Sequence, residues 1–242
     1  MLRFWYVIII SLPYIIYYLA KGSYIEKNAE RYSEADRYRV ALRVIHVMKR
    51  NGRIRTSVTG MENLPAEGGY VLYANHQGKY DALGIMLAHP KPCAMLWEEK
   101  SADRLVARQV CGLVEGTTIS FEDPKQQIGA LKTIAERVKE GKPYLIFPEG
   151  GYTDNKNELQ EFKSGCFACS LKSKTPIVPV VIYDSWRSMD TNTFERVRTQ
   201  VHFLPQIPYE EYGKLRKPDV CELVKKRIQE KLDELKEADP RR

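Results

Sequence analysis

The sequence predicts an α/β protein with a largely parallel central sheet flanked by helices, and three observations support this class. Short apolar runs with strand character alternate with longer amphipathic segments along most of the chain. Its 242 residues, 43% of them hydrophobic, are enough for a sizeable buried core. Reactive side chains follow two of the apolar runs where the strands end, which is where α/β folds place functional groups. We predict membrane-associated helices over residues 1–50 and the α/β domain over residues 51–242.

The N-terminal segment over residues 4–20 carries no charge and is flanked by Arg3 and Lys21. A straight helix of this length reaches about 26 Å, slightly short of a ~30 Å hydrocarbon core, and Pro13 would kink it. Its many aromatic residues prefer the headgroup level, so lying in one leaflet competes with spanning the bilayer. A buried core helix is the third alternative for this segment.

A second helix is predicted over residues 33–50, because the segment begins with a capping box and repeats valines at helical spacing. Basic residues decorate its other faces. The pattern fits an amphipathic helix at an anionic membrane surface, and it fits a solvated face of the same domain equally well.

The remaining elements follow from apolar periodicity and capping residues. Asp123 followed by Pro124 is typical of a helix start. We expect strands over residues 54–58, 69–74, 94–97, 143–147, 176–182 and 198–204. We expect helices over residues 81–88, 98–112, 123–141, 165–172 and 219–236.

The stretch from Tyr73 to Asp81 contains the first candidate site, with His76 and Asp81 five positions apart. On an ideal helix this spacing leaves the two side chains about 140° apart, so they meet only if His76 precedes the first helical turn. Asp81 could then accept the Nδ1 proton of His76 and leave Nε2 as a base for a hydroxyl group. A solvated loop pair is the structural alternative for this spacing.

A second candidate site follows the predicted strand over residues 143–147. This strand runs into a glycine turn that carries Glu149 at its exit. A largely parallel sheet places active groups at strand exits, so Glu149 is a second candidate functional residue.

Composition restricts the partners of the protein. The net charge of +7 and a pI near 9.0 fit an anionic partner such as phospholipid headgroups, a phosphorylated substrate or an acidic carrier protein. Nucleic acid is disfavoured because the sequence has no aromatic-basic recognition motif and no zinc-finger spacing. The five scattered cysteines favour a reducing compartment, and the lone pair Cys166 and Cys169 is more typical of packing than of a metal site. We therefore predict no metal.

Several segments together resemble the 1-acylglycerol-3-phosphate O-acyltransferase family of PlsC-like glycerolipid acyltransferases, over roughly residues 35–235. Asn75-His76 followed by four residues and Asp81 is similar to the first motif of the family. Phe-Pro-Glu-Gly at residues 147–150 is similar to its third motif, and Ile-Val-Pro-Val at residues 177–180 to its fourth. The order and spacing of these segments also agree with the family.

The resemblance implies the glycerolipid acyltransferase fold with an N-terminal membrane-docking helical pair. It also implies a membrane-associated enzyme that moves a fatty acyl group from acyl-CoA or acyl carrier protein to the hydroxyl of 1-acylglycerol-3-phosphate, giving phosphatidic acid. His76 oriented by Asp81 would be the general base, and the thioester would be a co-substrate with no further cofactor. The expected partners are a lysophospholipid, the thioester donor and an anionic membrane. The enzyme would be attached to the cytoplasmic face through residues 1–50.

Further site residues follow from the same resemblance. Glu149 would hold a glycerol hydroxyl or the catalytic loop, and backbone amides near Gly78 could stabilise the oxyanion. Lys100 falls where the family often has a phosphate-contacting lysine, and Arg104, Arg108 or Lys163 could help. The predicted substrate-binding residues are Asn75, Gly78, Lys100, Glu149, Gly150 and Lys163, of which Asn75 and Gly150 shape the turns.

Two departures from the family pattern concern the acceptor. Tyr152 stands where the third motif usually has a phosphate-binding arginine, and the second motif ends in the acids Glu122 and Asp123. A lyso-aminolipid or another phosphate-free lysolipid is therefore an alternative acceptor. A thioesterase, with water as the nucleophile, is an alternative from another enzyme class, and a non-catalytic membrane adaptor is a third.

Overall fold

A seven-stranded sheet forms the centre of the molecule in the computed structural model, which describes residues 2–102 and 105–239. Its strands are β1 (Ile54–Thr59), β2 (Val71–Ala74), β3 (Ala94–Glu98), β4 (Thr117–Ile119), β5 (Tyr144–Ile146), β6 (Ile177–Tyr183) and β7 (Val197–Phe203). The strand order is β1-β7-β6-β2-β5-β3-β4. Neighbouring strands are parallel except β6 and β7, which are antiparallel. The predicted, largely parallel sheet is confirmed.

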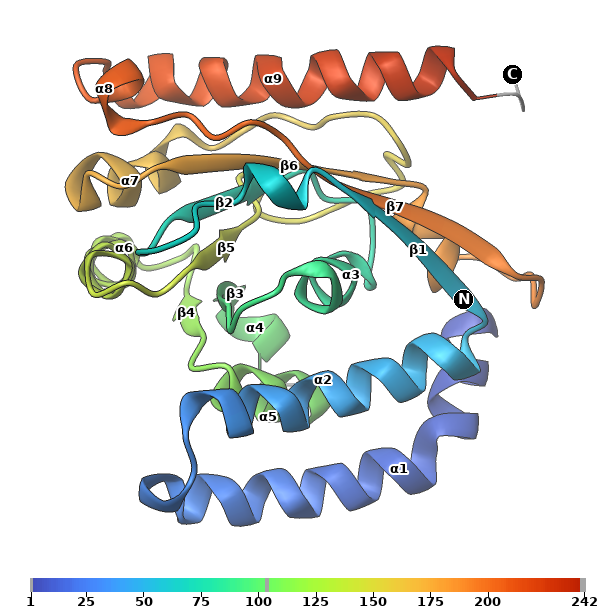
Figure 1. The fold of residues 1–242 in the computed structure, drawn as a ribbon. Helices are drawn as coiled ribbons and strands as arrows, with labels where there is room; N and C mark the ends of the chain where they lie inside the picture. Colours follow the sequence, from blue (N-terminus) through green and yellow to red (C-terminus); the bar gives the residue numbers. More distant parts are fainter. Residues whose placement is uncertain (1, 103–104, 240–242) are drawn as a thin grey trace.

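Helices cover both faces of this sheet (Figure 1). They are α1 (Leu2–Lys27), α2 (Glu34–Asn51), α3 (Asp81–Ala88), α4 (Glu99–Ala102), α5 (Leu105–Leu113), α6 (Pro124–Lys139), α7 (Ala168–Ser173), α8 (Tyr209–Tyr212) and α9 (Lys217–Glu237). Short 3₁₀ turns are η1 (Ala29–Arg31), η2 (Met61–Asn63), η3 (Ser164–Phe167) and η4 (Ser185–Ser188). One apolar cluster joins α6, α7 and α9 to one face of the sheet, and a second joins α3 to the other.

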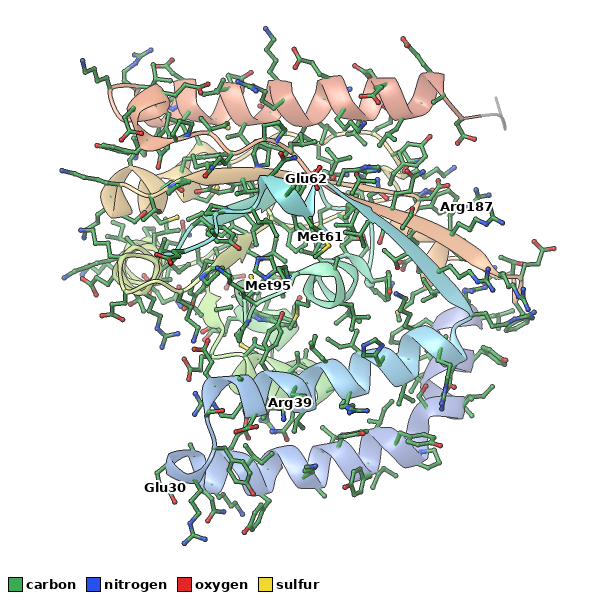
Figure 2. The ribbon with its side chains drawn as sticks, viewed as in Figure 1. Glu30, Arg39, Met61, Glu62, Met95 and Arg187 are labelled. Atoms are coloured by element: carbon green, nitrogen blue, oxygen red, sulfur yellow. The ribbon has the colours of Figure 1, made fainter. Side chains whose placement is uncertain are left out.

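Strand β2 lies at the centre of the sheet and is buried on both faces. Val71 and Tyr73 belong to the cluster beneath α9, whereas Leu72 and Ala74 belong to the cluster beside α3. A parallel strand covered on both sides is expected to be apolar throughout. Figure 2 shows Met95 of β3 within the interior, on the α3 side of the sheet. The central strands therefore fix the positions of the turns that follow their carboxyl ends.

The capping residues recognised in the sequence begin the helices as expected. The Ser33 hydroxyl accepts a hydrogen bond from the Asp36 amide at 3.2 Å, and α2 follows. The Asp123 carboxylate accepts from the Lys125 amide at 2.9 Å at the start of α6. The helix predicted over residues 98–112 corresponds to α4 and α5, which lie on either side of residues 103–104. Residues 103–104 between them, including the predicted phosphate contact Arg104, lie outside the described residues.

Helix α1 is longer than the apolar segment predicted over residues 4–20. It bends in its first half (Figure 1), and Pro13 lies within it, where a missing amide and ring clashes disrupt helical geometry. Among the described residues, α1 is the one helix long and apolar enough to cross a membrane by length and composition. One side of it packs on the protein through Arg3, Val7, Ser11, Ile15, Gly22 and Ile25.

Helices α1 and α2 form an outer layer that packs on α3 and α5 (Figure 1). Ile25 of α1 and Ile45 of α2 share one cluster with Met86 of α3 and Val110 of α5. Figure 2 shows Arg39 of α2 on this layer. The N-terminal layer is therefore joined to the sheet domain by apolar packing, and a domain boundary at residue 50 stays a prediction.

Candidate active site

The candidate site lies at the carboxyl ends of three neighbouring central strands. His76 follows β2 by two residues, Glu149 follows β5 by three, and η4 follows β6. Polar groups at this edge of a parallel sheet face an opening rather than the core. The two candidate sites of the sequence therefore form one site, although 73 residues separate them along the chain.

His76 and Asp81 form a hydrogen-bonded pair, with Nδ1 of His76 2.6 Å from Oδ2 of Asp81. His76 lies in the turn before α3 and Asp81 is the first residue of that helix, which is the geometry predicted from their spacing. Asp81 is fully buried, whereas the His76 side chain is 18% exposed. When Nδ1 donates to Asp81, the lone pair is on Nε2, so the ring can accept a proton from a hydroxyl or a water.

Two aromatic side chains confine the His76 ring. Phe147 stacks on it with ring centroids 4.3 Å apart and an interplanar angle of 22°. Tyr152 meets it edge-on at 4.7 Å. Tyr152 stands where the resemblance predicts an arginine, so this position contributes a ring beside the histidine instead of a cation.

Glu149 contacts the histidine turn through its backbone. One carboxylate oxygen, Oε1, accepts a hydrogen bond from the His76 amide at 2.9 Å, and Oε2 accepts from Nε2 of Gln160 at 2.5 Å. Burial raises the pKa of Glu149, although both hydrogen bonds favour its charged form. Both oxygens are thus engaged within the protein, which places Glu149 as a support of the turn.

Two amide side chains fix the turn to β6. Nδ2 of Asn75 donates to the Ile182 carbonyl at 3.0 Å, and Oδ1 of Asn75 accepts from the Ile182 amide at 2.8 Å. Oε1 of Gln77 accepts from the Ser185 amide at 2.9 Å. Asn75 is buried. Its hydrogen bonds position the turn, the role that the sequence predicted for it, and its assignment to substrate binding stays a prediction.

The predicted oxyanion donors near Gly78 are occupied within the protein. The amides of Gln77 and Gly78 donate to Oδ2 of Asp81 at 2.5 and 2.8 Å, and the amide of Lys79 donates to Asp190 at 3.1 Å. The turn before a helix start exposes amides without backbone partners, and here the buried Asp81 and the partly exposed Asp190 accept from them. Stabilisation of an oxyanion by these amides stays a prediction, and it would require one of these hydrogen bonds to open.

The predicted cations lie in different surroundings. Gly150 has a positive φ of 74°, and a Cβ atom built there would meet Nζ of Lys163 at 2.5 Å, so the lysine lies directly over the glycine turn. This ammonium also lies 3.9 Å from the ring centroid of Phe121. Lys100 is 72% exposed on α4 and pairs with Glu122. Only Lys163 of these two is in contact with the turn that carries Glu149.

Several supporting residues have no signal in the local sequence. Gln160 binds Glu149, and Nδ2 of Asn155 donates to the His76 carbonyl at 2.9 Å. Asp190 binds Lys79 of the histidine turn. All three come from loops outside the recognised motifs, whereas Asn75 and Phe147 lie within them.

A cavity of about 430 Å³ lies behind this turn, lined by residues 154–158, Tyr183, Trp186 and Lys236. Asn155 connects its wall to His76, but His76 itself does not line it. Within residues 2–102 and 105–239, no group of three or more His, Cys, Asp or Glu side chains could hold a metal ion. Among the described residues, the reactive side chains of the site are therefore His76 and Asp81.

Comparison with known proteins agrees with the motifs. A family model described as Acyltransferase matches residues 55–183, which is more than half of the chain. The 1-acyl-sn-glycerol-3-phosphate acyltransferase alpha of Ovis aries is 28% identical over 172 residues, covering 70% of this chain and 59% of the relative. The 1-acyl-sn-glycerol-3-phosphate acyltransferase of Saccharomyces cerevisiae is 32% identical over 198 residues, covering 79% of this chain and 63% of the relative. The chain thus spans less than two thirds of either relative.

A solved structure has the same fold. The crystal structure of the 1-acyl-sn-glycerophosphate acyltransferase PlsC from Thermotoga maritima matches with a TM-score of 0.75 and 18% sequence identity. The match covers 97% of this chain and 95% of that chain, and so includes the N-terminal helices as well as the sheet. From the family model and the motifs at its site, this chain belongs to the acyltransferase family.

Proposed function

We propose that this protein is a membrane-associated O-acyltransferase that converts 1-acylglycerol-3-phosphate to phosphatidic acid, with acyl-CoA or acyl carrier protein as the donor. The observation that carries the proposal is the His76 ring, partly exposed and hydrogen-bonded through Nδ1 to the buried Asp81 carboxylate at 2.6 Å. Family membership and the names of the sheep and yeast relatives support the same reaction class.

The reaction needs one base and no covalent enzyme intermediate. Nε2 of His76 takes the proton of the acceptor hydroxyl while the hydroxyl oxygen attacks the thioester carbonyl. The tetrahedral intermediate expels the thiolate, which receives the proton from the imidazolium, and the ester is released. Asp81 orients the ring and stabilises its charged form, as in other base pairs of this kind. Phe147 and Tyr152 hold the ring plane.

Glu149 is assigned to holding the catalytic turn. The sequence left two roles open, a contact with a glycerol hydroxyl or a support of the loop, and the engagement of both oxygens favours support. A glutamine at this position keeps an oxygen that can accept from the His76 amide. An alanine removes that acceptor, so the two substitutions separate charge from support.

Glu149→Gln is expected to keep most of the acyl transfer activity, whereas Glu149→Ala loses ~10-fold or more because the turn is released.

The pKa of Glu149 also predicts a difference in stability. Because burial raises this pKa, the folded protein binds the carboxyl proton more tightly than the unfolded protein does. The free energy of unfolding of wild type therefore falls as the pH rises above the ordinary carboxyl pKa of 4.5. Chemical unfolding should therefore show a stability gain of Glu149→Gln over wild type that grows with pH. Parallel pH curves, or equal activity loss in both variants, would contradict the assignment.

Lys163 is the favoured cation for the acceptor phosphate. Its ammonium lies over the glycine turn that follows β5, and the described residues show an aromatic ring rather than a carboxylate beside it. Lys100 remains a predicted contact, but its ion pair with Glu122 would have to open first. A charged hydrogen bond to phosphate is worth roughly 1.5–3 kcal/mol, enough to replace part of a missing arginine.

Lys163→Ala should lower kcat/KM for lysophosphatidic acid by ~10–100-fold while changing turnover of a monoacylglycerol by less than ~3-fold. Lys100→Ala is the matched comparison, with a smaller expected loss because its charge is already paired on the surface. Mass spectrometry of the lipids formed from a lysolipid panel provides the measurement. Faster acylation of a lyso-aminolipid than of lysophosphatidic acid by wild type would favour the alternative acceptor. Release of free fatty acid without any acceptor would favour the thioesterase.

The attachment to the cytoplasmic face of a membrane is assigned to residues 1–50, with α1 lying in one leaflet. One side of α1 is packed on the protein, so a spanning orientation would require it to detach. Its other side exposes large apolar residues, a composition suited to the interface: Leu2, Trp5, Ile9, Ile10, Leu12, Tyr14, Ile16, Tyr17 and Tyr24. Basic residues on α2 could add attraction to anionic headgroups.

The double variant Trp5→Gln with Ile9→Gln should bind anionic liposomes ~100-fold more weakly, because the two side chains are 58% and 65% exposed and each would lose its burial in lipid. Ile128→Gln on α6, where an isoleucine is equally exposed, is the control and should sediment like wild type. Point changes are sharper than deletion of residues 1–20, which would also remove the packed side of α1. Undiminished sedimentation of the double variant would argue against docking through this stripe.

A further inference from the structure

The first turn of the apolar helix α1 contains a buried arginine, Arg3, which is only 1% exposed. Its guanidinium donates to the carbonyl oxygens of Ser188 at 2.8 Å, Thr193 at 2.7 Å and Glu195 at 2.8 Å, and also to that of Gly52. A buried guanidinium is stable only when its donors are satisfied, and here backbone carbonyls satisfy them. Attachment to a membrane does not by itself require these hydrogen bonds between α1 and the backbone of the protein.

The backbone of the same turn binds the same segment. The Leu2 amide donates to Oδ1 of Asn192 at 3.0 Å, and the Arg3 amide donates to the Thr191 carbonyl at 3.3 Å. Residues 188–195, which connect η4 to β7, therefore wrap around the start of α1. Figure 2 shows Arg187, the neighbouring residue of η4, at the outer side of this region. We call residues 188–195 the wrapping segment.

The wrapping segment also contacts the catalytic turn through Asp190. Its carboxylate accepts from the Lys79 amide at 3.1 Å and pairs with the Lys79 ammonium. A Cβ atom built on Gly78 would meet Oδ2 of Asp190, so the carboxylate lies directly against this glycine. Burial alone would lower the pKa of Lys79, but its contacts with Asp190 raise it.

A second route from α1 to the histidine runs through side chains. The Lys79 ammonium lies 5.7 Å from the ring centroid of Phe4 and 5.6 Å from that of Tyr152. Tyr152 in turn meets the His76 ring at 4.7 Å. Lys79 thus lies between the first turn of α1 and the ring that flanks the proposed base.

We propose that Arg3 is a positioning residue for the catalytic turn, acting through the wrapping segment, Asp190 and Lys79. This inference rests on the proposed function and extends it, because the helix that carries the apolar stripe is then also part of the scaffold that holds His76. Removing Arg3 leaves several carbonyls of the wrapping segment without their donor and frees Asp190 to move. A displacement of about 1 Å at a catalytic group can cost ~100-fold in rate.

The test measures kcat and KM on a short-chain, monomeric lysophosphatidic acid with a soluble acyl thioester, in the absence of any bilayer. Arg3→Lys keeps the charge but loses the planar fork of donors, and Arg3→Met loses both. We expect kcat to fall ~10–100-fold in Arg3→Met and less in Arg3→Lys, with KM within ~3-fold and liposome sedimentation retained. Lys172→Met, a change of an exposed lysine on α7, is the control and should match wild type.

Asp190→Asn tests the same route without touching α1 and keeps the proposal testable if Arg3→Met does not fold. It should also lower kcat. The double variant Arg3→Lys with Asp190→Asn should have a kcat only slightly below that of the less active single variant, because both residues act on one path. Wild-type kcat in Arg3→Lys and Asp190→Asn on the monomeric acceptor would overturn the proposal and leave α1 as an anchor.

A readout independent of turnover separates this inference from the proposed function. The His76 ring resonance followed by NMR should shift in Arg3→Lys and Asp190→Asn, and stay in place in Lys172→Met. If wild type transfers no acyl group, the proposed function fails, and the resonance alone decides the positioning. An unchanged resonance in both variants would overturn it.

Discussion

The structure of this site depends on a single carboxylate oxygen. Oδ2 of Asp81 receives Nδ1 of His76 and the amides of Gln77 and Gly78. These contacts hold three consecutive residues of the turn around one point at the start of α3, where the helix dipole also favours a negative charge. The histidine cannot rotate freely, because its ring is hydrogen-bonded on one edge and packed by Phe147 on one face. The proposed base is therefore oriented before any substrate arrives.

The sheet order makes this arrangement possible. Because β2 lies between β5 and β6, the turn after β2 has neighbours on both sides. Glu149 holds the His76 amide from the β5 side, and the backbone of Ile182 holds Asn75 from the β6 side. The start of α1 binds the wrapping segment through Arg3, and Asp190 of that segment binds Lys79 of the same turn. The proposed base, the sheet and the apolar helix α1 are thus connected at one turn of the chain.

The sequence was sufficient wherever the determinants are local. The strand before His76, the helix beginning at Asp81 and the caps at Ser33 and Asp123 follow from patterns within a few residues, and they are confirmed. The meeting of the two sites could also be anticipated, because parallel strands bring their carboxyl ends to one edge. The helix predicted over residues 98–112 also agrees with α4 and α5 in the part that the structure describes.

The supporting contacts could not be predicted, for a physical reason. Arg3 is separated from its carbonyl partners in the wrapping segment by 185–192 residues, and Asp190 lies 111 residues from Lys79, so nothing in either local pattern indicates the pairing. From the sequence alone, an arginine before an apolar segment is expected to be an exposed charge at the membrane edge. The folded chain shows instead that Arg3 is buried. The occupied amides near Gly78 have the same origin, because their acceptors are fixed by tertiary structure.

The central claim is that the His76 ring is the base for acyl transfer, and it is tested most directly by phosphatidic acid formation in His76→Ala. Mass spectrometry of the product should show at least a ~100-fold lower rate than wild type, with liposome binding and thermal unfolding unchanged. Asp81→Asn should lose less, because it disturbs the tautomer and orientation of the base and leaves the ring in place. Phosphatidic acid formed by His76→Ala at the wild-type rate would contradict the account.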